Sequence, residues 1–172
     1  ETMMPFCVSP RTAVSPDGEQ VASASALAPG VPPKRFRIIS VSASGDTSIN
    51  REYSYNPEPV TSRVVDSVRA IRRLTARTAS GVAIAADLPL PEFFPPVFRV
   101  VIANDGRLLV GMREKGPRRI WRLIDRWGKE IGSIDLPRTV EVQLMEGDLL
   151  WGTEQDENDL ESIVRYRITR GN

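Results

Sequence analysis

The strongest constraint on the fold is a repeated alternation of short apolar segments and tight turns. The clearest turn is Asn104-Asp105-Gly106, between the apolar runs 98–103 and 107–112. Asp-Gly accommodates the positive φ angles of a two-residue hairpin turn, so a β-hairpin is predicted here. Apolar runs of this length, bounded by such turns, are typical of antiparallel strands rather than of long helices.

The pattern recurs along the chain and predicts about eleven strands. We expect three blade-like units, at about 11–55, 97–135 and 139–169, each an up-and-down antiparallel sheet. The 172 residues lie within the range of roughly 100 to 200 residues that one domain usually occupies. We therefore predict a single, mainly β domain over residues 1–172.

Residues 60–96 interrupt this rhythm with a predicted helix and a linker. Apolar residues recur at helical spacing from Val64 to Leu74, with Thr61 or Ser62 available as the N-cap. An amphipathic helix is expected there. The following segment 88–96 contains four prolines, which lack a backbone donor and fix φ, so it is predicted to be an extended linker.

The order of these pieces resembles the C-terminal half of a bacterial six-bladed β-propeller family. The similarity rests on the Ser15-Pro16-Asp17-Gly18 turn, the helix inserted after Pro59, the segment Asp125-Arg126-Trp127-Gly128-Lys129, and Leu149-Leu150-Trp151-Gly152. The resemblance implies binding rather than chemistry. Three blades make an incomplete ring, because a closed propeller has at least four. We expect a fragment, a chain that pairs with a second chain, or open sheets packed on a partner.

Composition argues against an enzyme and against cofactors. The chain has no histidine, and Cys7 is its single cysteine, so the commonest general base and intramolecular disulfides are absent. No phosphate-binding glycine loop or nucleophile elbow is present. The acidic run 154–161 lacks the glycine and register of a calcium-binding EF-hand loop, so we interpret it as a solvated loop and expect no metal.

Charge and hydropathy limit the possible partners. The formal net charge is +1, with 23 basic and 22 acidic residues, which gives no global attraction for nucleic acid. No apolar stretch is long enough to span a bilayer. The chain begins at Glu1 rather than Met, which is expected after processing, removal of a leader or truncation.

Two sets of residues are candidates for binding. The first set combines basic side chains of the helix and of one hairpin with two adjacent aromatic residues between prolines: Arg69, Arg73, Arg77, Phe93, Phe94, Arg118 and Arg119. The second set, Trp121, Trp127 and Trp151, would line a ligand site if the rings met around an open cavity, and would serve as core if they were buried between sheets.

We therefore expect a non-catalytic scaffolding or binding subunit of a larger bacterial assembly. By the resemblance, its place is the periplasmic face of a membrane, with protein subunits of a membrane-embedded complex as partners, including a photosynthetic or electron-transfer complex. The alternative is a small-molecule or sugar-binding β-propeller, with hydrolase activity third.

Overall fold

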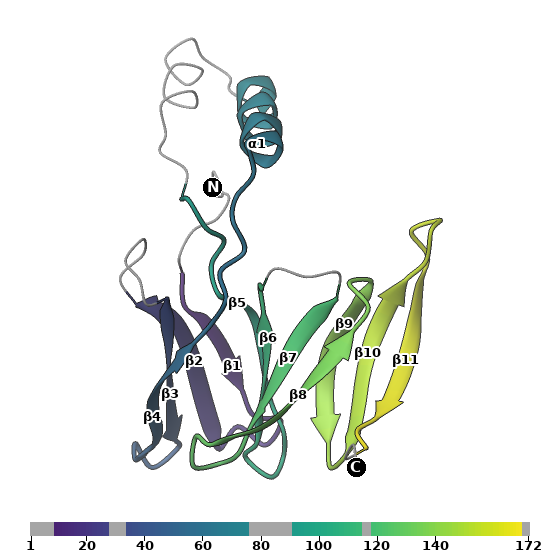
Figure 1. Cartoon of the computed structure of the whole chain (residues 1–172). Coiled ribbons are helices and arrows are strands. Elements are labelled where there is room, and N and C mark those ends of the chain that lie inside the picture. Colours follow the sequence, from purple (N-terminus) through teal and green to yellow (C-terminus); the bar gives the residue numbers. More distant parts are fainter. Residues whose placement is uncertain (1–8, 28–33, 76–90, 115–117, 170–172) are drawn as a thin grey trace.

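The computed structural model describes residues 9–27, 34–75, 91–114 and 118–169, without the side chains of Arg72, Arg73 and Thr75. Cys7 and Arg77 lie outside these ranges. The described residues form eleven strands and one helix (Figure 1). The strands make three separate antiparallel sheets, each with its strands in chain order or its exact reverse. The prediction of a mainly β fold of up-and-down sheets with one inserted helix is confirmed.

Sheet 1 comprises the first four strands. They are β1 (Arg11–Val14), β2 (Gln20–Leu27), β3 (Arg35–Ser42) and β4 (Thr47–Ser54). The turn between β1 and β2 is closed by a hydrogen bond from the Gly18 amide to the Ser15 carbonyl at 2.9 Å. Gly18 has a φ of 77°, a conformation that favours glycine, so the Asp-Gly signal placed this turn correctly.

Sheet 2 contains the predicted Asn104-Asp105-Gly106 hairpin. Its strands are β5 (Val97–Ile102), β6 (Leu108–Met112), β7 (Arg119–Ile124) and β8 (Glu130–Leu136). At the first turn the Gly106 amide donates to the Ala103 carbonyl at 2.9 Å, and the Asp105 carboxylate accepts from the Arg107 amide at 3.1 Å. Local side-chain and backbone bonds of this kind fix the register of the hairpin.

Sheet 3 has three strands among the described residues. They are β9 (Val140–Glu146), β10 (Leu149–Gln155) and β11 (Glu161–Arg167). A register shift between Trp151 and Gly152 accommodates the close approach of Gly152 to β9, where an added Cβ would lie 2.3 Å from the Glu141 carbonyl oxygen. Gly152 is therefore required by packing of the backbone rather than by a turn.

Helix α1 (Ser62–Thr75) begins at one of the two predicted capping residues and stands away from the sheets (Figure 1). The proline-rich segment that follows was predicted to be an extended linker without ladder bonds. Its non-proline residues do pair, because the Phe94 amide donates to the Glu58 carbonyl at 3.0 Å and the Glu92 carbonyl accepts from Val60 at 2.9 Å. The chain thus leaves and re-enters the sheets as a short paired stem.

The core consists of two apolar clusters, one on each face of sheet 2. The first joins sheet 2 to sheet 1 through buried residues that include Phe36, Ile38, Leu108 and Val110. The second joins sheet 2 to sheet 3 through buried residues that include Val101, Leu109, Trp121, Val142 and Leu150. Sheet 2 is therefore the middle layer of a three-sheet stack, and all five residues of β6 are buried.

Arg122 joins sheet 1 to sheet 2 by polar contacts at the border of the first cluster. Its guanidinium donates to the Ser54 carbonyl at 2.7 Å and to a Glu114 carboxylate oxygen at 2.5 Å, and it lies 3.4 Å from Glu130. The side chains of Arg122 and Glu114 are only 15% and 10% exposed. A pair this poorly hydrated is costly to break, because either partner alone would be a buried, unpaired charge.

Tyr53 makes the second polar link between the two sheets. Its hydroxyl donates to the Gly128 carbonyl at 2.7 Å, and Gly128 adopts a φ of 83°. A Cβ at Gly128 would lie 2.9 Å from Ile49, so only glycine fits this turn without displacement. Burial raises the pKa of Tyr53 to about 12, and the nearby carboxylates of Asp125 and Glu130 add to the increase, partly offset by Arg51.

Replacing Arg122 by alanine is expected to lower the free energy of unfolding by about 3 kcal/mol, because Glu114 is left as a poorly hydrated charge. Arg35→Ala is the matched control, since Arg35 is 52% exposed and its ion pair with Glu52 is worth less than about 1 kcal/mol. Urea unfolding of both variants measures the difference. Equal losses would mean that the Arg122 contacts do not hold the sheets together.

The raised pKa of Tyr53 leads us to predict a loss of folding stability at alkaline pH. The hydroxyl of an unfolded tyrosine ionises near pH 10, whereas that of folded Tyr53 stays protonated until about pH 12. Its contribution to stability is therefore complete below pH 10 and is lost as the pH rises to 12. Urea midpoints across this window should fall more steeply for the wild type than for Tyr53→Phe. Parallel curves would contradict the assignment.

Candidate binding surfaces

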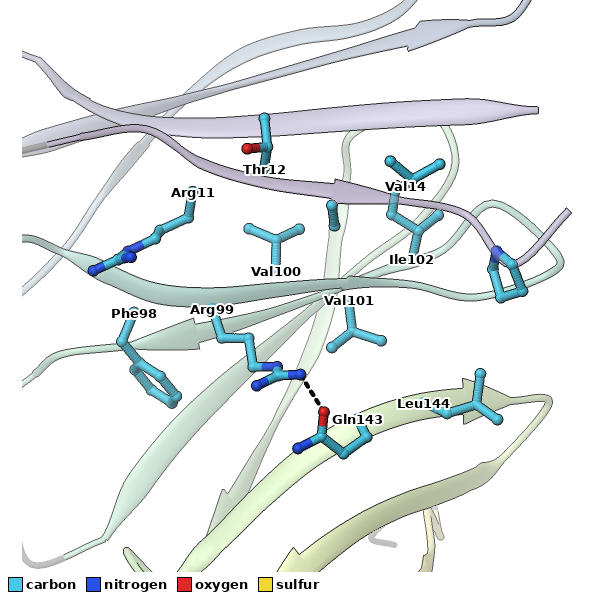
Figure 2. A pocket seen from close by; sticks show the side chains of 12 residues that line it. Arg11, Thr12, Val14, Phe98, Arg99, Val100, Val101, Ile102, Gln143 and Leu144 are labelled. Carbon is cyan, nitrogen blue, oxygen red and sulfur yellow. Dashed lines mark hydrogen bonds between the residues drawn. The ribbon is translucent and has the colours of Figure 1, made fainter. Parts of the chain in front are cut away.

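A cavity of about 410 Å³ lies along the first strands of the three sheets. Its walls come from β1, β5 and β9, whose positions around the opening are visible in Figure 2. The polar side chains that reach it are Arg11, Thr12, Arg99 and Gln143, and the apolar lining includes Phe98 and Val101. Polar groups make up most of its exposed lining, which favours a polar ligand over an apolar one.

Arg99 bridges the cavity from sheet 2 to sheet 3. Its guanidinium donates to the Gln143 side-chain oxygen (Figure 2). The same guanidinium lies 3.7 Å from the Glu141 carboxylate. Arg119 approaches the same Glu141 at 3.6 Å and lies over the Phe98 ring at 4.9 Å. Glu141 therefore neutralises part of the positive charge on this side, and the site offers hydrogen bonds as well as charge.

The outer face of sheet 3 is a second candidate surface. We define it by Leu144, Leu149, Trp151 and Ile163, which alternate with the inward-facing residues of β9, β10 and β11. Ile163 is 80% exposed, and the Arg165 guanidinium lies 5.4 Å from the Trp151 ring. Four neighbouring apolar side chains on an open sheet face are typical of an association surface.

The outer face of sheet 1 is the third candidate surface. We define it by Val14, Val21, Ile39 and Val41, which occupy neighbouring positions on three adjacent strands. Val14 is 61% exposed and Val21 is 43% exposed. The Arg37–Glu52 pair on the same side is closed at 3.0 Å, so this face combines apolar area with internally compensated charge.

The predicted partner-binding residues do not form one surface. Arg69 is exposed on α1, the side chain of Arg73 is not described, and Arg77 lies outside the described residues. Phe93 and Phe94 are half-buried, with the Lys34 ammonium 4.3 Å from the first ring and the Arg113 guanidinium 4.9 Å from the second. Intramolecular cation–π contacts therefore cover part of both rings.

The two hairpin arginines of that set also make contacts within the chain. Arg118 donates to the Asp135 carbonyl at 3.1 Å, and Arg119 belongs to the Glu141 cluster beside the cavity. Burial lowers the pKa of neighbouring Arg113, opposed by Glu58. The six of these residues that the structure describes thus divide between the helix, the paired stem and the hairpin at the border of sheets 2 and 3.

The three tryptophans lie in three different environments. Trp121 is fully buried between sheets 2 and 3, where it packs edge-to-face on Phe98 at 5.1 Å. Trp127 is exposed in the turn between β7 and β8, next to Arg126. Trp151 stands on the outer face of sheet 3. None of the three lines the cavity between the first strands.

Sequence reasoning missed the cavity residues and both outer faces. The available signal was an apolar run without alternation: Leu149-Leu150-Trp151 has apolar residues on both sides of one strand, as Leu108-Leu109-Val110 does in sheet 2. A strand with such a run is expected to be covered by other residues on both faces of its sheet. Arg11 and Arg99 gave no comparable signal, because their proximity depends on how the sheets pack.

The described residues contain no group of three or more His, Cys, Asp or Glu side chains placed to hold a metal ion. The single helix that they form is too short and too polar to cross a membrane.

Comparison with known proteins gives a similarity in structure alone. No family model and no curated protein matches the chain. Among solved structures it is similar to the β-propeller domain of the Trilobed protease from Pyrococcus furiosus, with 12% sequence identity and a TM-score of 0.39. The match covers 94% of this chain and 56% of that one, so this chain spans about half of that chain's length.

Proposed function

We propose that the chain is a non-catalytic binding and scaffolding module that associates with other protein subunits through the outer faces of sheets 1 and 3. The observation that carries this proposal is the exposure of Ile163, Val14 and Val21 on two open sheet faces, with half-buried Trp151 beside Ile163. Burial of apolar area stabilises association by about 25 cal/mol per Å². Surfaces of this kind are stabilised when another protein covers them.

A narrower form of the proposal places the module at the periplasmic face of a bacterial membrane complex, such as a photosynthetic or electron-transfer complex. It rests on the family resemblance of the repeated turns and the inserted helix. Exposed Arg69 on α1 supplies a positive group for contact with acidic subunits or lipid headgroups.

A second candidate function is binding of a small molecule or sugar in the cavity between β1, β5 and β9. The observation in its favour is the convergence of Arg11, Arg99 and Gln143 on an opening of about 410 Å³. Hydrogen-bond donors and acceptors at fixed positions beside apolar walls suit a polar ligand with one hydrophobic side.

Capture experiments with the native host test the first candidate. Tagged wild type is expected to retain defined subunits at a fixed stoichiometry in native mass spectra, whereas Ile163→Lys should reduce their retention at least about tenfold, since a buried unpaired charge costs more than 1.4 kcal/mol. Ile131→Lys is the matched control, because Ile131 is 48% exposed on β8 and belongs to neither outer face.

Equal retention by the wild type and Ile163→Lys would contradict association through sheet 3. The same spectra address the second candidate. A small-molecule adduct that survives in Ile163→Lys and disappears in Arg99→Ala would assign function to the cavity instead.

A further inference from the structure

The middle sheet shows what the outer face of sheet 3 is built to contact. Sheets 2 and 3 can be aligned at their first turns. Near that turn each sheet has a buried cross-strand pair that faces the preceding sheet, which is Ile102 with Leu108 in sheet 2 and Met145 with Leu150 in sheet 3. The next pair, one residue further from the turn, is Val101 with Leu109 in sheet 2 and Leu144 with Trp151 in sheet 3. Leu144 and Trp151 therefore occupy the positions of two residues that are buried against the next sheet.

The equivalence extends to the third strand of each sheet. Trp121 pairs with Gly111 in sheet 2, and Ile163 pairs with Thr153 at the matching place in sheet 3. Trp121 is fully buried against sheet 3, whereas Ile163 is 80% exposed. The outer face of sheet 3 thus repeats, position by position, a face that elsewhere in this chain is covered by a following sheet.

The outer face of sheet 1 repeats the opposite side of sheet 2. Val14 pairs with Val21 immediately before the first turn, as Ile102 pairs with Leu108. On the third strand Val41 pairs with Val21, as Ile124 pairs with Leu108 in sheet 2. Ile102, Leu108 and Ile124 are buried against sheet 1, the preceding sheet. The outer face of sheet 1 is therefore equivalent to a face that a preceding sheet covers.

We propose that the occupant of each face is a second copy of this chain, with the outer face of sheet 3 of each copy packed on the outer face of sheet 1 of the other. The inference rests on the proposed function and names its partner. One chain supplies both halves of the contact, and joining them continues the order in which sheet 1 meets sheet 2 and sheet 2 meets sheet 3.

The shapes and charges of the two faces agree with this pairing. The outer face of sheet 3 has the bulky Trp151. The outer face of sheet 1 has small side chains at Thr12 and Ser23, which pair with each other across β1 and β2. Arg37 and Glu52, paired across β3 and β4 on the same face, neutralise each other at 3.0 Å. The contact therefore places a large side chain against small ones, with the Arg165 guanidinium beside Trp151 at 5.4 Å.

The two faces differ, so the contact is head-to-tail and must either close a ring or extend into a filament. Propellers close with at least four sheets, and the described residues of one copy form three, so two copies supply six. The smallest closed arrangement has six sheets and two identical contacts. In it, the β1–β5–β9 cavities of the two copies would face each other across the axis.

Native mass spectrometry and light scattering on the full chain test the inference. A dimer is expected, and Ile163→Lys on one face or Val21→Lys on the other should each raise its dissociation constant more than about tenfold. Ile131→Lys should remain dimeric. Far-ultraviolet circular dichroism and urea unfolding of each variant establish that it is folded, and Val21→Ser replaces Val21→Lys if the latter is not.

Mixing the two lysine variants separates a head-to-tail contact from a symmetric one. The mixture retains one intact pair of faces and should form a heterodimer that neither variant forms alone. A wild type that stays monomeric, a dimer insensitive to Val21→Lys, or a filament would each overturn the two-copy ring. Capture of other subunits that is lost in Ile163→Lys would then leave the scaffolding proposal standing without this partner.

Discussion

The structure depends on burial of both faces of sheet 2. Every residue of β6 is buried, and the two apolar clusters that fix sheets 1 and 3 share this sheet as their common wall. Apolar burial stabilises by about 25 cal/mol per Å², which makes a doubly covered sheet the most stable layer of the stack. Sheets 1 and 3 are each covered on one side only. The difference between these layers is the physical basis of the proposed association.

Polar contacts add to the apolar packing between the layers and determine how the layers are oriented. Arg122 and Tyr53 each cross from one sheet to the other and end on backbone carbonyls, of Ser54 and Gly128 respectively. A hydrogen bond to a fixed carbonyl is directional, whereas apolar packing tolerates sliding. Arg99 links sheets 2 and 3 in a similar way, because its guanidinium donates to the side-chain oxygen of Gln143.

The sequence predicts local structure well because turns and periodicity are local properties. Asp105-Gly106 fixed one hairpin, and helical spacing from Val64 located α1 to within a few residues. Packing between sheets is not local. The sequence did not indicate that Trp121, Trp127 and Trp151 lie in three environments, or that Phe93 and Phe94 are partly covered by Lys34 and Arg113. These outcomes depend on which residues of distant strands meet.

Amide hydrogen exchange in the native state tests most directly whether the doubly covered sheet is the foundation of the fold. At concentrations low enough to keep the chain monomeric, the account predicts the slowest exchange in β6, with faster exchange in β3 and β10, the central strands of the two outer sheets. Exchange in β3 or β10 that is as slow as in β6 would contradict it, because a sheet covered on one side would then be as stable as the sheet covered on both.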